Sequence, residues 1–121
     1  MKITANTQVF SVIDEMAALI YHTASRFPGS DRYGLSSQIR RTAVSMTTSL
    51  AESYTAIKNE DIRSSLLSAY NSLRSLHYQI GLAQRLGYID ERHFAVCDRK
   101  AAEADNTLKH QLSLLDARVE A

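Results

Sequence analysis

Apolar residues recur every three or four positions along most of the chain, and this spacing predicts amphipathic helices. In the first stretch the recurring residues are Val9, Ile13, Met16, Ile20, Ala24 and Phe27. Positions spaced in this way lie on one face of a helix with 3.6 residues per turn. Three later stretches repeat the spacing. We predict helices over residues 7–27, 36–57, 60–86 and 91–119.

Residues that favour helix ends separate these stretches. The segment Phe27-Pro28-Gly29 closes the first helix, because a residue before proline disfavours helix. Gly87 ends the third helix. The predicted N-terminal caps are Thr7 for the first helix, Ser36 or Ser37 for the second and Asp90 for the fourth, and Asn59 begins the third. Short connections between helices of similar length favour antiparallel neighbours. We therefore predict one all-α domain over residues 1–121, an antiparallel up-down-up-down four-helix bundle.

Composition narrows the class of protein. The 121 residues suit one domain, and the formal net charge of +1 argues against a protein built mainly to grip a polyphosphate. Cys97 is the one cysteine, which excludes an internal disulfide and Cys-based metal sites, and its place on the apolar stripe predicts a buried thiol. No apolar run approaches the roughly 20 residues of a membrane span, so a cytoplasmic protein is expected.

Several phrases occur in the order of a known family. They are Phe27-Pro28, Tyr33-Gly34-Leu35, the run from Gln38 to Ser45, Leu50-Ala51-Glu52 and Leu86-Gly87-Tyr88-Ile89. Through them the chain resembles the four-helix-bundle family of 23S ribosomal RNA intervening-sequence proteins over nearly its whole length. The resemblance implies a homopentameric ring. Through the related accessory variability determinant of diversity-generating retroelements, it also implies a reverse transcriptase as one kind of partner.

The chain departs from the family's pattern at several polar positions. Ser49 and Ser53 stand where the family commonly has Asn and Gly, and Ser75 and His77 stand where it commonly has Glu. Ala56 and Ile57 replace residues that are often polar.

Sequence motifs for catalysis or metal binding are absent. A di-iron bundle needs paired Glu-x-x-His motifs, and the nearest approach is Asp90-x-x-His93 at a helix start. His93 is there expected to be an exposed first-turn residue. No serine or cysteine is paired with a base by a recognisable motif. We expect no metal, no cofactor and no enzymatic activity.

A basic and aromatic stripe is predicted on the third helix. Arg63, Arg74 and Arg85 are spaced 11 residues apart, about three turns, and Tyr70 and Tyr78 lie four residues either side of Arg74. Guanidinium groups beside aromatic rings suit phosphate contact and base stacking, or an acidic patch on a protein. The alternative is a solvated face on which arginine stems cover tyrosine rings.

Arg40 and Arg41 form a second basic element on the second helix. Adjacent helical residues point about 100° apart, so both cannot face one site. One is expected to pair with an acid on a neighbouring helix or subunit, and direct contact with a partner or nucleic acid is the alternative.

Hydroxyl side chains form two further stripes. The residues are Ser65, Ser68, Ser72 and Ser75 on the third helix and Thr42, Ser45, Ser49 and Ser53 on the second. Small polar residues at helical spacing let two backbones approach closely. We predict a tight helix contact or a subunit interface, with a hydroxyl-lined ligand groove as the alternative.

Two functional hypotheses follow from these features. In the first, the protein is a non-catalytic accessory protein whose oligomer presents the basic and aromatic surface to RNA, DNA or a ribonucleoprotein. In the second, it is a docking scaffold for a co-encoded protein such as a reverse transcriptase, with no direct nucleic-acid contact.

Overall fold

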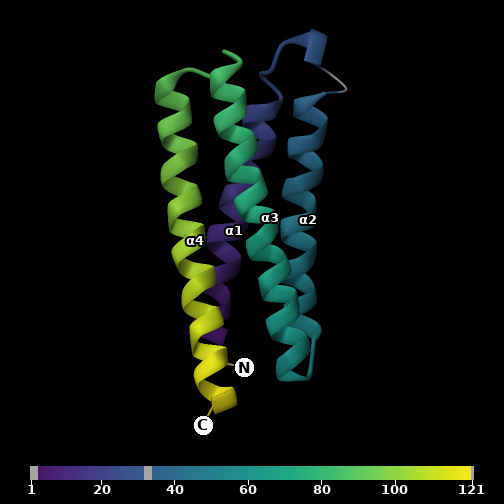
Figure 1. Cartoon of the computed structure of the whole chain (residues 1–121), viewed down its shortest axis with the longest axis vertical. Coiled ribbons are helices and arrows are strands. Elements are labelled where there is room, and N and C mark those ends of the chain that lie inside the picture. The colour runs from purple at the N-terminus through teal and green to yellow at the C-terminus, as the bar shows by residue number, and fades with distance from the viewer. Residues whose placement is uncertain (1–2, 32–33, 121) are drawn as a thin grey trace.

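The chain folds into four long helices, as a computed structural model shows (Figure 1). The structure describes residues 3–31 and 34–120. The elements are α1 (Ile3–Ala24), a short 3-10 turn η1 (Gly29–Asp31), α2 (Leu35–Thr55), α3 (Asn59–Arg85) and α4 (Glu91–Glu120). Consecutive helices run in opposite directions in Figure 1, so the predicted all-α up-down-up-down bundle is confirmed.

Each helix packs against two neighbours, in the cycle α1–α2–α3–α4–α1. The predicted apolar stripes of all four helices supply the core. Its largest fully buried side chains are Ile13, Met16, Ile20, Ile39, Met46, Leu73, Leu76, Ile80, Cys97 and Leu108. Cys97 is completely buried, as its place on the stripe predicted. Because the four helices pack in this cycle, the side of the bundle formed by α3 and α4 lies opposite the side formed by α1 and α2.

The first two helices begin at residues other than the predicted ones. α1 starts at Ile3, so Thr7 lies inside the helix. α2 starts at Leu35, and its cap is the carboxylate of Asp31, which accepts hydrogen bonds from the backbone N–H of Leu35 (3.1 Å) and Ser36 (2.8 Å). The prediction that Ser36 or Ser37 caps this helix is therefore wrong. The sequence favoured these two serines because they lie at the start of the apolar spacing. The turn before α2 instead places the Asp31 carboxylate beside the first N–H groups of the helix.

The second helix is also shorter than predicted. It ends at Thr55, because Ala56 adopts an extended conformation with φ −69° and ψ 143°. Ile57, the last residue of the predicted helix 36–57, instead lies in the connection to α3 and is 94% exposed.

The connection between α3 and α4 follows the prediction. Gly87 has a φ of +80° and donates its N–H to the Gln84 carbonyl, while Tyr88 donates to the Ala83 carbonyl, each at 2.9 Å. These two bonds make a Schellman motif, which satisfies carbonyls left free at a helix end. Asp90 then caps α4 by accepting the N–H of His93 at 2.7 Å.

Residues of two separate connections meet at one end of the bundle. The Phe27 and Tyr88 rings lie 5.2 Å apart, and the Tyr88 hydroxyl donates to Asp31 at 3.5 Å. Ile89 is buried beside them. The phrases around Phe27 and Tyr88 therefore serve to close this end of the fold. Among the described residues, none of the helices has the length and apolar character to cross a membrane.

Candidate nucleic-acid interface

The predicted stripe lies on the exposed side of α3, next to α4. Arg74 donates to the Tyr70 hydroxyl at 3.3 Å, and its guanidinium carbon is 5.8 Å from the centre of that ring. The guanidinium carbon of Arg85 is 5.6 Å from the centre of the Tyr78 ring. Both distances allow cation–π attraction, which is worth about 0.5–1 kcal/mol at an exposed site. The structure therefore brings each of these two arginines onto a tyrosine of the same helix.

Two cationic side chains and one histidine of this face lie next to carboxylates of α4. Their closest N···O distances are 2.7 Å for Arg63–Asp116, 2.6 Å for His77–Asp98 and 3.1 Å for Lys109–Asp105. All three pairs are at least partly exposed, so water and salt screen them and each contributes little to stability. The hydrogen bond to Asp105 also raises the pKa of Lys109.

These acidic partners were missed at the level of sequence. Asp98, Asp105 and Asp116 are separated by 7 and 11 residues, so one face of α4 carries all three. That spacing could have indicated an acidic stripe. Asp105 pairs with Lys109 on α4 itself, four residues further along. The partners of Asp98 and Asp116 lie on α3, and which α3 residue each carboxylate meets depends on the axial register of the two helices, which apolar periodicity does not specify.

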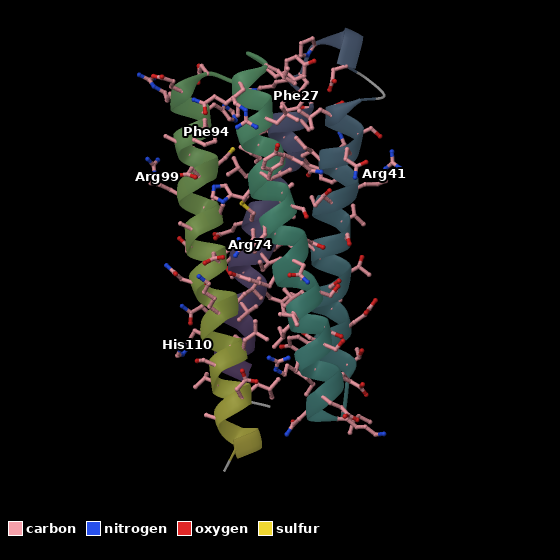
Figure 2. All side chains as sticks on the ribbon, in the orientation of Figure 1. Phe27, Arg41, Arg74, Phe94, Arg99 and His110 are labelled. Atoms are coloured by element: carbon pink, nitrogen blue, oxygen red, sulfur yellow. The ribbon has the colours of Figure 1, made fainter. Side chains whose placement is uncertain are left out.

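Arg74 and Arg85 remain available to a ligand. In the described ranges 3–31 and 34–120, neither guanidinium has a carboxylate within 4.0 Å. Both side chains are exposed. Figure 2 shows Arg74 in the region where α3 borders α4. The uncompensated positive charge of the predicted stripe is thus reduced from three arginines to two.

A groove of about 600 Å³ runs between α3 and α4 beside these arginines. Its α3 side includes Arg74, Tyr78, Gly81 and Arg85, and its α4 side includes Phe94, Ala101 and Ala102. The groove has free space beside Gly81, since a Cβ built there would approach only the Arg85 guanidinium, at 3.4 Å. Tyr78 is 68% exposed at the rim. The groove combines an aromatic ring, small apolar residues and two arginines with a lysine–carboxylate pair, Lys109 and Asp105.

The second basic element lies elsewhere on the bundle. Arg41 donates to the Ser37 hydroxyl at 3.2 Å and projects from α2 away from α4 (Figure 2). Arg40 is half-buried. Within the part of the chain that the structure describes, neither arginine pairs with an acid of a neighbouring helix, and the predicted pair with another subunit stays a prediction. Neither belongs to the α3–α4 groove.

The two hydroxyl stripes face each other across the α2–α3 contact. Ser45 and Ser72 are 3.3 Å apart between their hydroxyl oxygens, and Ser49 and Ser68 are 3.0 Å apart. The hydroxyls of Thr42 and Ser53 instead bond to carbonyls of α2 itself, Ser65 is half-buried and Ser75 is exposed. Direct contacts between such small side chains require closely approaching backbones.

A polar groove of about 600 Å³ borders this contact. Ser68, Ser72 and Ser75 line it together with Arg41 and Gln79. The Oε1 atom of Gln79 is buried and has no hydrogen-bond partner among the described residues. Because the groove is open, water can reach its hydroxyl-lined walls.

His93 is half-buried rather than exposed as predicted. Its Nε2 atom lies 2.9 Å from the Thr23 hydroxyl, which donates its own proton to the Leu19 carbonyl at 2.8 Å. The ring nitrogen must therefore be the donor to Thr23. His93 does lie in the first turn of α4, as predicted, but α1 packs against α4 there and covers part of its ring.

Cys97 completes this cluster, 3.8 Å from the Thr23 hydroxyl. Burial raises the pKa of the Cys97 thiol, more than the hydrogen bond to Thr23 lowers it. The thiol is thus protonated at neutral pH and poorly nucleophilic. Across residues 3–31 and 34–120, no three His, Cys, Asp or Glu side chains are grouped so as to hold a metal ion.

Comparison with known proteins supports both the family and the fold. A family model described as 23S rRNA-intervening sequence protein matches residues 5–110. The fold is similar to the crystal structure of a protein of unknown function from the S23 ribosomal protein family of Bacteroides thetaiotaomicron, with a TM-score of 0.84. The two chains are 19% identical, and the match covers 90% of this chain and 98% of that one. No curated protein matches the chain significantly.

Proposed function

We propose that this chain, which belongs to the 23S rRNA-intervening sequence protein family, is a non-catalytic accessory protein whose α3–α4 face binds nucleic acid. One observation carries the proposal. Arg74 and Arg85 each lie over a tyrosine ring, have no carboxylate partner in the described part of the chain, and stand at the rim of one groove. Guanidinium groups form bidentate bonds to phosphate, and aromatic rings stack on bases.

The non-catalytic part of the proposal is supported by how the potential nucleophiles are used. Cys97 is buried as a protonated thiol. Ser45, Ser49 and their α3 partners are engaged with one another, and Ser53 donates to the Leu50 carbonyl. These hydroxyls are thus committed to helix packing rather than to a neighbouring base.

The proposed protein is also an oligomer of this bundle. Tyr21 on α1 is 44% exposed and Val44 on α2 is 47% exposed. Contact between copies through the α1–α2 side would cover these apolar groups and leave the opposite α3–α4 face free. Light scattering coupled to size exclusion measures the subunit number directly. A Val44→Glu variant is expected to lower that number, and an unchanged assembly would place the contact elsewhere.

The test of nucleic-acid binding uses the purified full chain. Fluorescence anisotropy with labelled single-stranded RNA and labelled duplex DNA, at 50 and 200 mM NaCl, is expected to show binding that weakens with salt. An Arg74→Gln/Arg85→Gln variant should lose about tenfold or more of the affinity. Arg63→Gln should lose less, because Asp116 already occupies that guanidinium.

Arg26→Gln is the matched control, since Arg26 is an exposed arginine at the end of α1. It removes the same charge and is expected to keep wild-type affinity. Circular dichroism checks that every variant is folded. Failure of the folded protein to bind either nucleic acid at 50 mM NaCl would overturn the proposal.

A protein partner is the second candidate, favoured by the alternation of acids and bases on this face. Asp98, Asp105 and Asp116 lie among the cations and would repel phosphate. A surface of mixed charge instead complements a mixed surface on another protein. Wild-type binding to a co-encoded enzyme such as a reverse transcriptase, without nucleic-acid binding, would favour this second function.

A further inference from the structure

The number of unpaired cations on the α3–α4 face limits how strongly it can bind phosphate alone. Arg63, His77 and Lys109 lie next to carboxylates, and the two arginines of the groove lining, Arg74 and Arg85, have no carboxylate partner among the described side chains. Proteins held on duplex DNA by its backbone typically make about 6–10 phosphate contacts. Two contacts provide a small part of that attraction. A ligand that binds here tightly must gain affinity from another interaction.

Tyr78 offers that interaction to a base. Its side chain is 68% exposed, and Arg85 at 5.6 Å from the ring centre holds the ring from one direction. Beside the ring, Gly81 adds no side chain to the groove, and Phe94 and Ala101 form an apolar wall on α4. A planar base can therefore stack on the tyrosine and cover apolar surface in the groove.

The two arginines lie on either side of this stacking surface. Arg74 precedes Tyr78 by one turn, about 6 Å along the helix axis, and Arg85 follows it by two turns, about 10 Å. A strand whose base rests on Tyr78 would have phosphates on both sides of that base. This arrangement needs an unpaired base, because in a duplex the base faces are already covered by their neighbours.

Resting on the proposed nucleic-acid function, we infer that the α3–α4 face binds single-stranded nucleic acid in preference to a duplex, with an unpaired base stacked on Tyr78. Arg74 and Arg85 then contact the flanking phosphates. Gly81 is the position that gives the base room. Stacking is tolerant of sequence, since every base has a π face, so this site selects strandedness rather than sequence.

The test compares one labelled 12-nucleotide RNA, alone and annealed to its complement, by anisotropy at several NaCl concentrations. The single strand is expected to bind at least about tenfold more tightly than the duplex at 100 mM NaCl. Its log affinity should fall against log salt with a slope of about −1.4, from two contacts at about −0.7 each. Tyr78→Ala should weaken single-strand binding by about 5- to 100-fold without changing that slope.

Two further variants keep the result interpretable. Val96→Ala trims another exposed apolar side chain, on α4 outside the groove lining, and is expected to leave affinity unchanged. Gly81→Leu fills the groove beside the ring without removing a charge, and is expected to weaken the single strand as Tyr78→Ala does. Circular dichroism shows that each variant is folded.

The outcomes separate this inference from the proposed function. Equal or tighter duplex binding, or wild-type affinity in folded Tyr78→Ala, would overturn the single-strand inference and leave nucleic-acid binding standing. Absence of binding to both probes would overturn the proposed function and, with it, this inference.

Discussion

Two glycines near the end of α3 have different backbone conformations, so replacing each with alanine should have opposite effects on stability. Gly81 lies within the helix, whereas Gly87 follows it with a φ of +80°. Gly81→Ala should raise the free energy of unfolding by about 0.5–1 kcal/mol, because glycine inside a helix is unfavourable and the new Cβ meets only the mobile end of Arg85, at 3.4 Å. Gly87→Ala should lower it by about 1–2 kcal/mol, since the left-handed conformation is strained for alanine. Urea denaturation measures both free energies of unfolding. A loss of stability in Gly81→Ala would contradict the presence of free space beside Gly81.

Cys97 should make the stability of the fold depend on alkaline pH. Burial raises its pKa above the ordinary value of 9.0, so the unfolded chain loses this proton first as the pH rises. The contribution is therefore full below about pH 9 and is lost as the pH rises from there through the folded pKa. Urea denaturation between pH 7.5 and 10 should show falling stability in the wild type and a flatter profile in Cys97→Ala. Identical slopes in both proteins would show that Cys97 is not responsible.

At the scale of elements, the sequence predicted each helix but not the contacts between helices. The number of helices, their order and the buried faces follow from apolar spacing, because burying a stripe is what stabilises a helix in a bundle. The conformational freedom of glycine also predicted that α3 ends just before Gly87, and the helix ends at Arg85. The cap from Asp31, the exposure of Ile57 and the pair between Arg63 and Asp116 were not predictable. The cap depends on the conformation of the turn before α2, the exposure of Ile57 depends on where α2 ends, and the ion pair depends on the register of α3 against α4. Apolar spacing specifies none of these.

The α2–α3 contact provides the prediction at this scale. Ser49 is buried, and its hydroxyl oxygen lies 3.0 Å from that of Ser68. Ser49→Leu should lower the free energy of unfolding by about 1–3 kcal/mol, because a larger side chain forces the two backbones apart. Ser49→Ala should cost about 1 kcal/mol or less, since it removes one modest hydrogen bond and keeps the small volume. The midpoints of urea denaturation distinguish the two, and equal effects would show that the hydroxyl, not the close approach, matters at this contact.

At the scale of the whole molecule, opposite sides of the bundle have different surface chemistry. Helices α1 and α2 expose apolar groups such as Tyr21 and Val44, and α3 and α4 expose others such as Tyr78 and Val96. The α3–α4 side also carries ion pairs and a groove whose two arginines have no carboxylate partner among the described side chains. A bundle can thus assemble through one side and bind a ligand on the other. Repetition of the α3–α4 face around an oligomer would also multiply a positive field that is small in one copy, where the net charge is +1.

Salt should separate the stability of the bundle from its proposed binding activity. The pairs Arg63–Asp116 and His77–Asp98 are roughly half-exposed, while the core is apolar. Raising NaCl from 50 to 500 mM should therefore change the free energy of unfolding by about 1 kcal/mol or less. Nucleic-acid affinity should fall at the same time, because cations compete for phosphate. Thermal denaturation and anisotropy under matched buffers measure the two effects. A large loss of stability would show that the ion pairs hold the α3–α4 face together, and weaker binding in salt would then reflect a loosened face rather than screened phosphates.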